Sequence, residues 1–370
     1  MEMARIGNNI YKRTDGRYEG RYVIGRKPDG KTRFGYVYGY QYQTVYNKLL
    51  IKKAETITGV VQRKKKTELL NTWFSNWMNM EVCPRVKIST YQTYEYLCKK
   101  HLYPLMDGVY LDSVTSNMVN SFIQKLINEG LAINTIKGIY RLFSAGIRAA
   151  YDEGYMPVNP CRKIKIRNKR LEERVLTKDE QKRIIKKAAD NQCMEVIMAL
   201  YTGMRLGEVC ALQWDDINWN QGTIRIRRTV QRIKARTDTS NRKTMLYVDS
   251  PKSEQSNRTL PVPSFILELL RKNKNTCDVN NYIFGKGQTP AEPRTIQRKA
   301  KKLLLENGIH NAHFHTFRHS FATRLIEIGI DIKTVSALLG HSSSALTLDI
   351  YSHCLIEHKQ DAISKLITYA

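Results

Sequence analysis

The stretch AHFHTFRHSFATRL, residues 312–325, places three histidines and an arginine within seven positions. His315 and His319 are four positions apart, which on a helix is the spacing of a pair of zinc ligands. Arg318 follows His315 by three positions and would share that helical face as a permanent cation. The stretch therefore poses two alternatives, a metal site or a site for an anion.

The surrounding residues favour the anion. No acidic residue occurs between Glu306 and Glu327 to complete a metal coordination sphere. An arginine beside a histidine supplies the planar donors that bind a phosphate. We therefore expect His315 and Arg318 to bind phosphate, the other two histidines to be structural, and no metal to be bound.

A second candidate for anion binding lies in TGMRLGEV, residues 202–209. Arg205 is expected at a helix N-terminus, where backbone N–H groups also favour an anion. Glu208, three positions later, can hold the guanidinium in place by an ion pair. An ordinary surface pair of arginine and glutamate fits this local pattern equally well.

Three more residues could move protons or attack a bound group. Lys252 is expected in the turn of a hairpin between MLYVDSPK and RTLPVP, from which it could swing over a ligand and donate a proton. Taken alone, such a lysine is more often a solvated surface residue. His341 directly follows Gly340, which is expected to end a helix. Tyr351 is expected on a short apolar helix, where a tyrosine taken alone would be a core residue.

The charge balance indicates a polyanionic partner. Lys and Arg number 61 against 34 Asp and Glu, which leaves a net charge of +27 and a pI near 9.8. Nucleic acid is the usual partner of such a chain, and a membrane surface is the alternative. No apolar run approaches the roughly 20 residues of a spanning helix, and the N-terminus does not resemble a signal peptide. With seven scattered cysteines, these features predict a cytoplasmic protein with reduced thiols.

The basic N-terminal region, residues 1–60, is predicted to be a small sheet with one helix. Aromatic and basic residues alternate on two strand-like runs around a turn at PDGK. The helix is expected to bury Val45, Leu49, Leu50 and Ala54. A sheet that is basic on one side suits a DNA groove. In the alternative, Tyr22, Tyr36 and Tyr38 only pair across strands, and the basic residues face water.

Residues 67–160 are predicted to be a helical domain. Apolar residues recur at helical spacing in four segments, so four helices are expected. Ser89 is expected to open the second helix and Asn134 to cap the fourth. Gly130 and Gly154 are expected to stop the third and fourth helices.

A basic linker, residues 161–175, is expected to run along a phosphate backbone, with a simply solvated linker as the alternative. Its candidate DNA-binding residues are Lys163, Lys165, Arg167 and Lys169. Thr177 and Glu180 form a capping box that begins the last domain, residues 176–370, in which helices, strands and more helices follow one another. The predicted fold class is mainly α with small β-sheets, divided among several domains.

Taken together, these motifs resemble the tyrosine recombinases, a family that includes phage integrases, Xer-type recombinases and the integrases of conjugative transposons. The resemblance rests on the order and spacing of Arg205, Lys252, the HTFRH segment, His341 and a tyrosine ten residues later. It covers about residues 67–360 and implies a helical core-binding domain followed by a mixed α/β catalytic domain. The N-terminal region is similar, less specifically, to an arm-site DNA-binding domain.

The resemblance implies a chemical role for each candidate residue. Tyr351 would attack a DNA phosphate to give a 3′-phosphotyrosyl link and a free 5′-hydroxyl. Arg205, Arg318 and His341 would stabilise the phosphate. His315 and Lys252 would assist proton transfer, and Glu208 would orient Arg205 in a supporting role. One ester replaces another, so no cofactor, metal or ATP is expected.

The expected partners are double-stranded DNA, at the core and arm sites of a mobile element and its target, and three further copies in a tetramer on DNA. An excisionase or a DNA-bending protein would be an accessory partner, and the protein would associate with the nucleoid rather than a membrane. The C-terminal segment, residues 359–370, is expected to dock on a neighbouring subunit, with packing inside its own subunit as the alternative. A topoisomerase of type IB and a catalytically inactive DNA-binding regulator are the alternative functions.

Overall fold

The computed structural model describes residues 9–26, 31–58, 68–161, 166, 174–235, 243–251, 254–274, 282–341, 343–344 and 347–348. Packing divides the chain into two compact units. The first contains Met1–Ser75, Leu105–Glu129 and Tyr140–Ile164, and the second contains Asn76–Pro104, Gly130–Ile139 and Lys165–Ala370. These units do not follow chain order, so the domain boundaries given above stay a prediction. Within the described ranges, no helix is long and apolar enough to cross a membrane.

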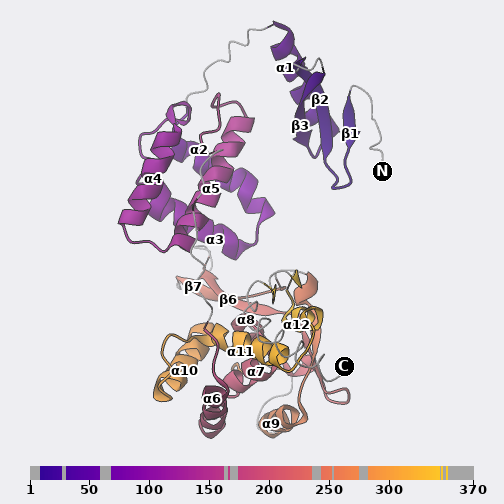
Figure 1. Cartoon of the computed structure of the whole chain (residues 1–370), viewed down its shortest axis with the longest axis vertical. Helices are drawn as coiled ribbons and strands as arrows, with labels where there is room; N and C mark the ends of the chain where they lie inside the picture. The colour runs from indigo at the N-terminus through magenta and orange to yellow at the C-terminus, as the bar shows by residue number, and fades with distance from the viewer. Residues whose placement is uncertain are drawn as a thin grey trace, which may run out of the picture. The chain divides into compact units, whose positions relative to one another are not determined.

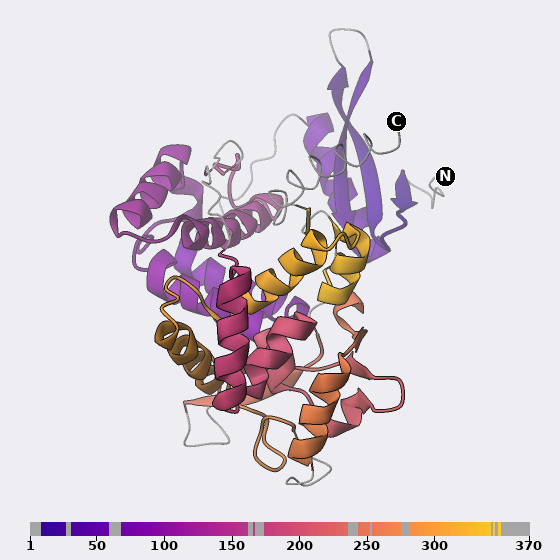
Figure 2. The same ribbon diagram turned by 60° about the horizontal axis from the view of Figure 1, so that its bottom comes forward.

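The N-terminal region is a three-stranded antiparallel sheet with a helix along one face (Figures 1 and 2). The strands are β1 (Ile10–Lys12), β2 (Tyr18–Arg26) and β3 (Thr32–Gly39), and the helix is α1 (Tyr42–Thr58). Ile10, Val45 and Leu49 form its buried core. Leu50 and Ala54 are exposed, so the expected helical face was wrong for these two. Val45 and Leu49 face the sheet, with Tyr42 and Tyr46 packed beside them, so the opposite side of α1 stays exposed.

The strand register separates two faces of this sheet. Residues opposite each other share a face, so the pairs Gly20–Val37 and Tyr22–Gly35 lie toward α1. The pairs Glu19–Tyr38, Arg21–Tyr36 and Val23–Phe34 lie on the other face, where Val23, Phe34, Tyr36 and Tyr38 are exposed. Tyr22 therefore packs in the core, unlike the two exposed tyrosines. Apart from Lys31, the predicted PDGK turn lies outside the described residues.

The four helices predicted between residues 67 and 160 are confirmed as α2 (Leu70–Trp77), α3 (Ile88–Leu97), α4 (Ser116–Asn128) and α5 (Ile133–Asp152). The helix α3 begins one residue before Ser89, and α4 and α5 end just before Gly130 and Gly154 as expected. Asn134 lies inside α5 rather than at its cap. Apolar spacing thus predicted the positions of the four helices, whereas the predicted cap of α5 was wrong.

An aromatic cluster joins α2, α4 and α5 in the first unit. The Phe74 ring is fully buried and stacks on Phe143 with 5.8 Å between centroids, and Phe122 lies 5.5 Å from Phe143. A Cβ on Gly146 would stand 2.4 Å from the Phe74 ring. The glycine therefore lets α5 approach this ring closely.

The sheets of the second unit differ from the sequence prediction. The run GTIRIRRTVQ forms two strands, β5 (Thr223–Ile226) and β6 (Thr229–Lys234), in different sheets. Strand β7 (Thr244–Asp249) pairs with β6. Strand β8 (Arg258–Pro261) pairs with β5, which pairs on its other side with β4 (Ile217–Asn218). The predicted hairpin between the runs of β7 and β8 was therefore wrong. Their connection, which contains Lys252, passes from one sheet to the other.

Helices make up most of the remaining second unit. The helix α6 (Lys178–Asp190) begins at the predicted capping box of Thr177 and Glu180. The helices α7 (Met194–Thr202) and α11 (Phe314–Glu327) pack against each other (Figure 1). All residues of α7 except Tyr201 are buried, so α7 forms the centre of the core. The other helices are α8 (Leu206–Cys210), α9 (Ser264–Lys274), α10 (Pro293–Glu306) and α12 (Ile332–Leu339).

We expect Phe74→Ala to destabilise the packing of α2 on α5 by about 3–5 kcal/mol, because it removes a fully buried ring and leaves a cavity. Hydrogen–deuterium exchange in peptides from α2 and α5 should accelerate by roughly two to three orders of magnitude, since about 1.4 kcal/mol corresponds to a factor of ten. Met80→Ala is the control, because Met80 is 80% exposed. Equal exchange in the two variants would contradict the central position of Phe74.

Candidate active site

Three arginines from three different elements meet the carbonyl end of α12. Arg318 on α11 donates from Nη2 to the Leu339 carbonyl at 2.7 Å, and Arg258 at the start of β8 donates from Nε to Leu338 at 2.7 Å. Arg205, the residue before α8, donates from Nη2 to the Gly340 carbonyl at 3.1 Å. Terminal carbonyls of a helix have no partner within the helix and carry its negative dipole end. The guanidinium groups donate hydrogen bonds to these carbonyls and place positive charge at the negative end of the helix dipole.

A single carboxylate joins two of these arginines. Glu208 Oε1 accepts from Arg205 Nη1 at 2.8 Å, and its Oε2 accepts from Arg258 Nη2 at 3.0 Å. The backbone N–H of Arg205 also donates to Oε2, at 3.0 Å. Burial by itself would raise the pKa of Glu208, but Arg258 and Arg205 together hold that pKa below its usual value. Glu208 is therefore an ionised carboxylate that fixes both arginines.

Arg318 is held from a second side by the end of α7. Its Nη1 donates to the Gly203 carbonyl at 2.7 Å, and the residue is only 2% exposed. Gly203 ends α7 with φ +63°, and a Cβ there would stand 2.5 Å from Phe321. Gly340 ends α12 with φ +64°, and a Cβ there would stand 2.9 Å from Arg258 Nη1. Only glycine fits both places where helix ends approach the arginines.

The helix containing the histidine cluster begins at Phe314, so His315 and His319 lie one turn apart as predicted, with ring centroids 4.7 Å apart. Burial and the nearby charge of Arg318 lower the pKa of His319 to about 4. The His315 ring is exposed, and its pKa is lowered first by partial desolvation and then by His319 and Arg318. Both rings are consequently neutral near pH 7.

His341 follows the end of α12 and lies in the same positive field. Partial burial, then Arg318 and Arg205, lower its pKa to about 4. Its backbone N–H donates to the Ser336 carbonyl at 3.1 Å, which fixes the residue to the last turn of α12. Its ring Nδ1 lies 2.8 Å from Oγ1 of Thr347, whose side chain is fully buried.

A cavity of about 640 Å³ opens beside this cluster. It is lined in part by Arg205, Glu208, Gly340 and His341, and also by Ser250 and Pro251. Since Pro251 precedes Lys252, the chain reaches the cavity rim immediately before that lysine. The guanidinium of Arg205 is more accessible than that of Arg258, with a side chain 36% exposed against 6%.

Four of the six predicted catalytic residues, Arg205, His315, Arg318 and His341, thus share one charged region, and Glu208 pairs with Arg205. The structure places Arg318 behind this region rather than on an open face, because carbonyls from α7 and α12 enclose its guanidinium. Other predicted site residues lie outside the described residues: Lys252, Tyr351, Lys163, Lys165, Arg167 and Lys169.

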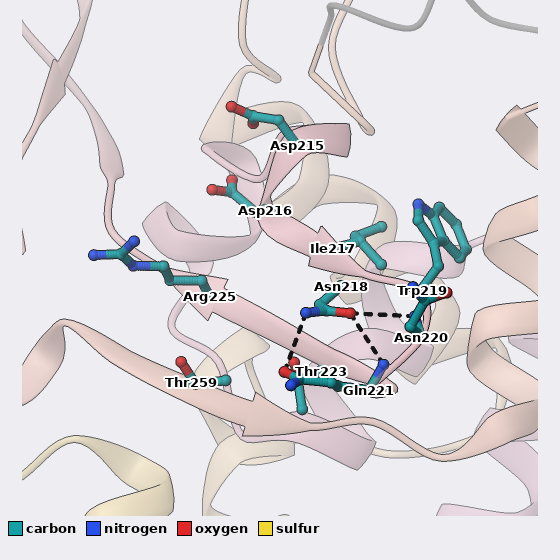
Figure 3. Close-up of a pocket in the computed structure, with 10 residues that line it drawn as sticks. All are labelled: Asp215, Asp216, Ile217, Asn218, Trp219, Asn220, Gln221, Thr223, Arg225 and Thr259. Carbon is teal, nitrogen blue, oxygen red and sulfur yellow. Dashed lines mark hydrogen bonds between the residues drawn. The ribbon is translucent and has the colours of Figure 1, made fainter.

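A second cavity, of about 490 Å³, lies on the sheet of β4, β5 and β8 and contains none of the predicted site residues (Figure 3). Several of its polar side chains have structural partners. Asp216 pairs with Arg227 and Arg228, and Asn218 closes the turn before β5 by accepting from the backbone N–H groups of Asn220 and Gln221. This cavity is therefore a poorer candidate for chemistry than the arginine cluster.

Sequence reasoning missed Arg258 and Thr347. The signal for Arg258 was its position in RTLPVP, two residues before the buried Leu260 and hence on the inward face of the strand. A cation at an apolar strand position implies a buried counter-charge. Thr347 carried no comparable signal, because its importance depends on a contact with His341, six residues earlier in the chain.

Comparisons with known proteins identify the family of this chain. The Phage integrase family matches residues 174–358, and the Phage integrase SAM-like domain matches residues 69–166. A protein named tyrosine recombinase XerC-like, from Caldanaerobacter subterraneus subsp. tengcongensis, is 28% identical over 93% of this chain and 94% of its own length. The ICEBs1 integrase of Bacillus subtilis is 25% identical over 76% of this chain and 78% of its own length.

A solved structure shows the same fold. The Tn1549 transposon integrase, in complex with transposon right end DNA, superposes with a TM-score of 0.69 at 19% identity, covering 81% of this chain and all of that one. The chain belongs to the phage integrase family. It is a tyrosine recombinase, an enzyme that cleaves and rejoins DNA in site-specific recombination.

We expect Arg258→Met to destabilise the second unit by about 3–5 kcal/mol, because it leaves the buried Glu208 with one cation fewer. Adding Glu208→Gln should recover part of that loss, since the uncompensated charge is then removed. Urea denaturation followed by circular dichroism measures both effects. Arg232→Met is the control, because its partner Glu292 is partly exposed and such pairs contribute about 1 kcal/mol or less. Additive losses in the double variant would contradict this account of Glu208.

Proposed function

We propose that this recombinase integrates and excises a mobile element, with Tyr351 as the nucleophile. The observation that carries the proposal is the arginine cluster beside the cavity. Three guanidinium groups and one carboxylate leave two positive charges in excess where a DNA phosphate would bind. Tyr351 follows His341 by ten residues, and the resemblance of this spacing to tyrosine recombinases supports its assignment.

In the proposed reaction, the phenol oxygen of Tyr351 attacks the scissile phosphorus and the bond to the 5′-oxygen breaks. The product is a 3′-phosphotyrosyl ester with a free 5′-hydroxyl on the other strand end. Arg205 donates to the non-bridging oxygens and stabilises the negative charge that grows there, because a prepositioned donor needs no reorganisation during the step. Arg318, whose guanidinium is enclosed by carbonyls of α7 and α12, acts on the same oxygens through its positive charge. His341 donates a further hydrogen bond to the same oxygens.

Two proton transfers accompany this exchange. His315 assists removal of the phenol proton, which an ordinary pKa near 10 would otherwise retain at neutral pH. Burial and nearby cations lower its pKa, so the imidazole is neutral and can accept a hydrogen bond from the phenol. Lys252 protonates the departing 5′-oxygen. Because one phosphoester replaces another of similar energy, the reaction needs no ATP, and the cationic side chains stabilise charge in the way metal ions do elsewhere.

The relatives support a mobile element as the substrate. They include an integrase of ICEBs1 and a transposon integrase bound to transposon right end DNA. We assign this chain to a conjugative transposon rather than a phage on these likenesses. It would act as a tetramer on DNA in the cytoplasm, with the nucleoid as its location, and the lambda integrase tetramer bound to a Holliday junction is the structural precedent.

The N-terminal sheet suits a second, arm-type DNA site. On the face away from α1, Arg21 lies 4.6 Å over the Tyr11 ring, and Arg17 lies 5.9 Å over Tyr38. Glu19 is buried beneath this layer and pairs with Arg13 and Arg21. The carboxylate and the rings thus orient a row of arginines on an exposed aromatic surface. Such a surface can enter a major groove while its guanidinium groups bind phosphates.

The remaining assignments concern segments outside the described residues. We propose that the basic linker, with Lys163, Lys165, Arg167 and Lys169, follows the phosphate backbone between the two DNA-binding domains. We also propose that residues 359–370 dock on a neighbouring subunit and connect active sites. An excisionase or a DNA-bending protein is the proposed accessory partner.

We expect Tyr351→Phe to abolish the covalent protein–DNA adduct while leaving DNA affinity unchanged, because only the nucleophilic oxygen is lost. A suicide core-site substrate resolved on a denaturing gel measures the adduct, and filter binding measures affinity. Tyr247→Phe, on β7, is the matched control and should form adduct normally. The adduct should also form in EDTA. An adduct formed by the Tyr351→Phe variant would refute the nucleophile, and a strict need for a divalent ion would refute the metal-free mechanism.

We expect Arg17→Gln to weaken binding of the full chain to an arm-site duplex and to reduce the slope of log affinity against log salt by about 1, as for one lost phosphate contact. Adduct formation on a core site should not change. Lys48→Gln is the control, because Lys48 is an exposed cation on α1, which covers the opposite face. Equal effects of the two substitutions on the slope would contradict the proposed DNA-binding face.

A further inference from the structure

Thr347 is a buried alcohol whose position the candidate site leaves unexplained. Its side chain is fully buried, and its Oγ1 lies 2.8 Å from Nδ1 of His341. A buried hydroxyl requires a hydrogen-bond partner, and the imidazole supplies one. Thr347 is six residues after His341 and four residues before Tyr351. The contact therefore ties the segment that leads to the proposed nucleophile back to the end of α12.

The hydrogen-bonding role of His341 depends on which ring nitrogen carries its proton. A neutral imidazole has one donor nitrogen and one acceptor nitrogen. The ring is neutral near pH 7, because partial burial and the charges of Arg318, Arg205 and Arg258 oppose a second proton. If Nδ1 carried the proton, Nε2 would present a lone pair, and a phosphate oxygen would be repelled.

We propose that Thr347 is a positioning residue that donates its hydroxyl proton to Nδ1 of His341 and thereby keeps the Nε2–H tautomer as the donor to the scissile phosphate. The inference rests on the proposed function, in which His341 binds that phosphate. A hydroxyl can also accept a hydrogen bond. If the phosphate's charge adds a second proton to the ring, Nδ1–H donates to Thr347 instead, so the same contact holds both forms in place.

The location of Thr347 gives this contact a second consequence. His341 is fixed to the last turn of α12 through the Ser336 carbonyl, whereas Thr347 belongs to the segment that precedes Tyr351. The tautomer is therefore set only when the Thr347 hydroxyl lies against the His341 ring.

Thr347→Val tests the proposal, because valine keeps the shape of threonine and lacks the hydroxyl. In single-turnover cleavage of a suicide core-site substrate by the full chain, we expect the rate to fall by roughly tenfold or more, as for loss of a buried hydrogen bond. The affinity for the same DNA should not change. Thr347→Ser retains the hydroxyl and should restore most of the rate, which a loss of packing alone would not predict.

A double-mutant cycle with His341→Ala separates this inference from the proposed function. His341→Ala alone should slow cleavage, and a normal rate would refute the role of His341 itself. In the His341→Ala background, Thr347→Val should have no further effect, because the imidazole on which it acts is absent. A normal rate for Thr347→Val alone, or an equal loss in both backgrounds, would overturn the positioning role.

The tautomer can also be observed directly. In protein labelled with ¹⁵N-histidine, long-range ¹H–¹⁵N spectra distinguish protonated from unprotonated ring nitrogens, and His341→Ala assigns the signal. We expect an unprotonated Nδ1 in the natural chain and in Thr347→Ser, and a mixture of tautomers in Thr347→Val. A protonated Nδ1 in the natural chain at neutral pH would overturn the proposal.

Discussion

The carbonyl end of α12 accepts hydrogen bonds from three arginines, and the candidate active site is organised around that interaction. The arginines come from the start of α8, the start of β8 and the middle of α11, which are far apart in the sequence. Each carbonyl at a helix end needs a donor, and each guanidinium needs an acceptor or an anion. Satisfying these needs together brings three elements to one place and leaves His341 directly beside them.

Repulsion among the three arginines destabilises the cluster, and neighbouring groups reduce that repulsion. Three cations close together repel one another, and Glu208 reduces that repulsion by pairing with Arg205 and Arg258. The negative dipole end of α12 reduces it further. Two positive charges stay in excess, and together with burial, which is the larger cause, they lower the pKa values of His315 and His341 and keep both rings neutral. A bound phosphate would satisfy this excess, so the same charge that strains the free protein favours the substrate.

The helices of the chain were largely predictable, whereas several tertiary pairings were not. Apolar spacing located α2 to α5, and the capping box of Thr177 and Glu180 located the start of α6, because both signals are local. The hairpin expected to hold Lys252 was wrong, because strand partners are chosen by side-chain burial and sheet geometry across long separations. Leu50 and Ala54 of α1, which are exposed, were misassigned because the extent of the opposing sheet cannot be read from the helix.

By itself, the sequence determined the residue types at the candidate site, their order along the chain and the phosphate chemistry they suit. Charge excess and the Arg–His spacing carry that information locally. Only the tertiary structure decided that Arg318 is enclosed by carbonyls, that Arg258 shares Glu208 with Arg205, and that Thr347 faces His341. These contacts join residues from different elements, and their energies depend on burial. Burial is a property of the packed chain and not of any short segment.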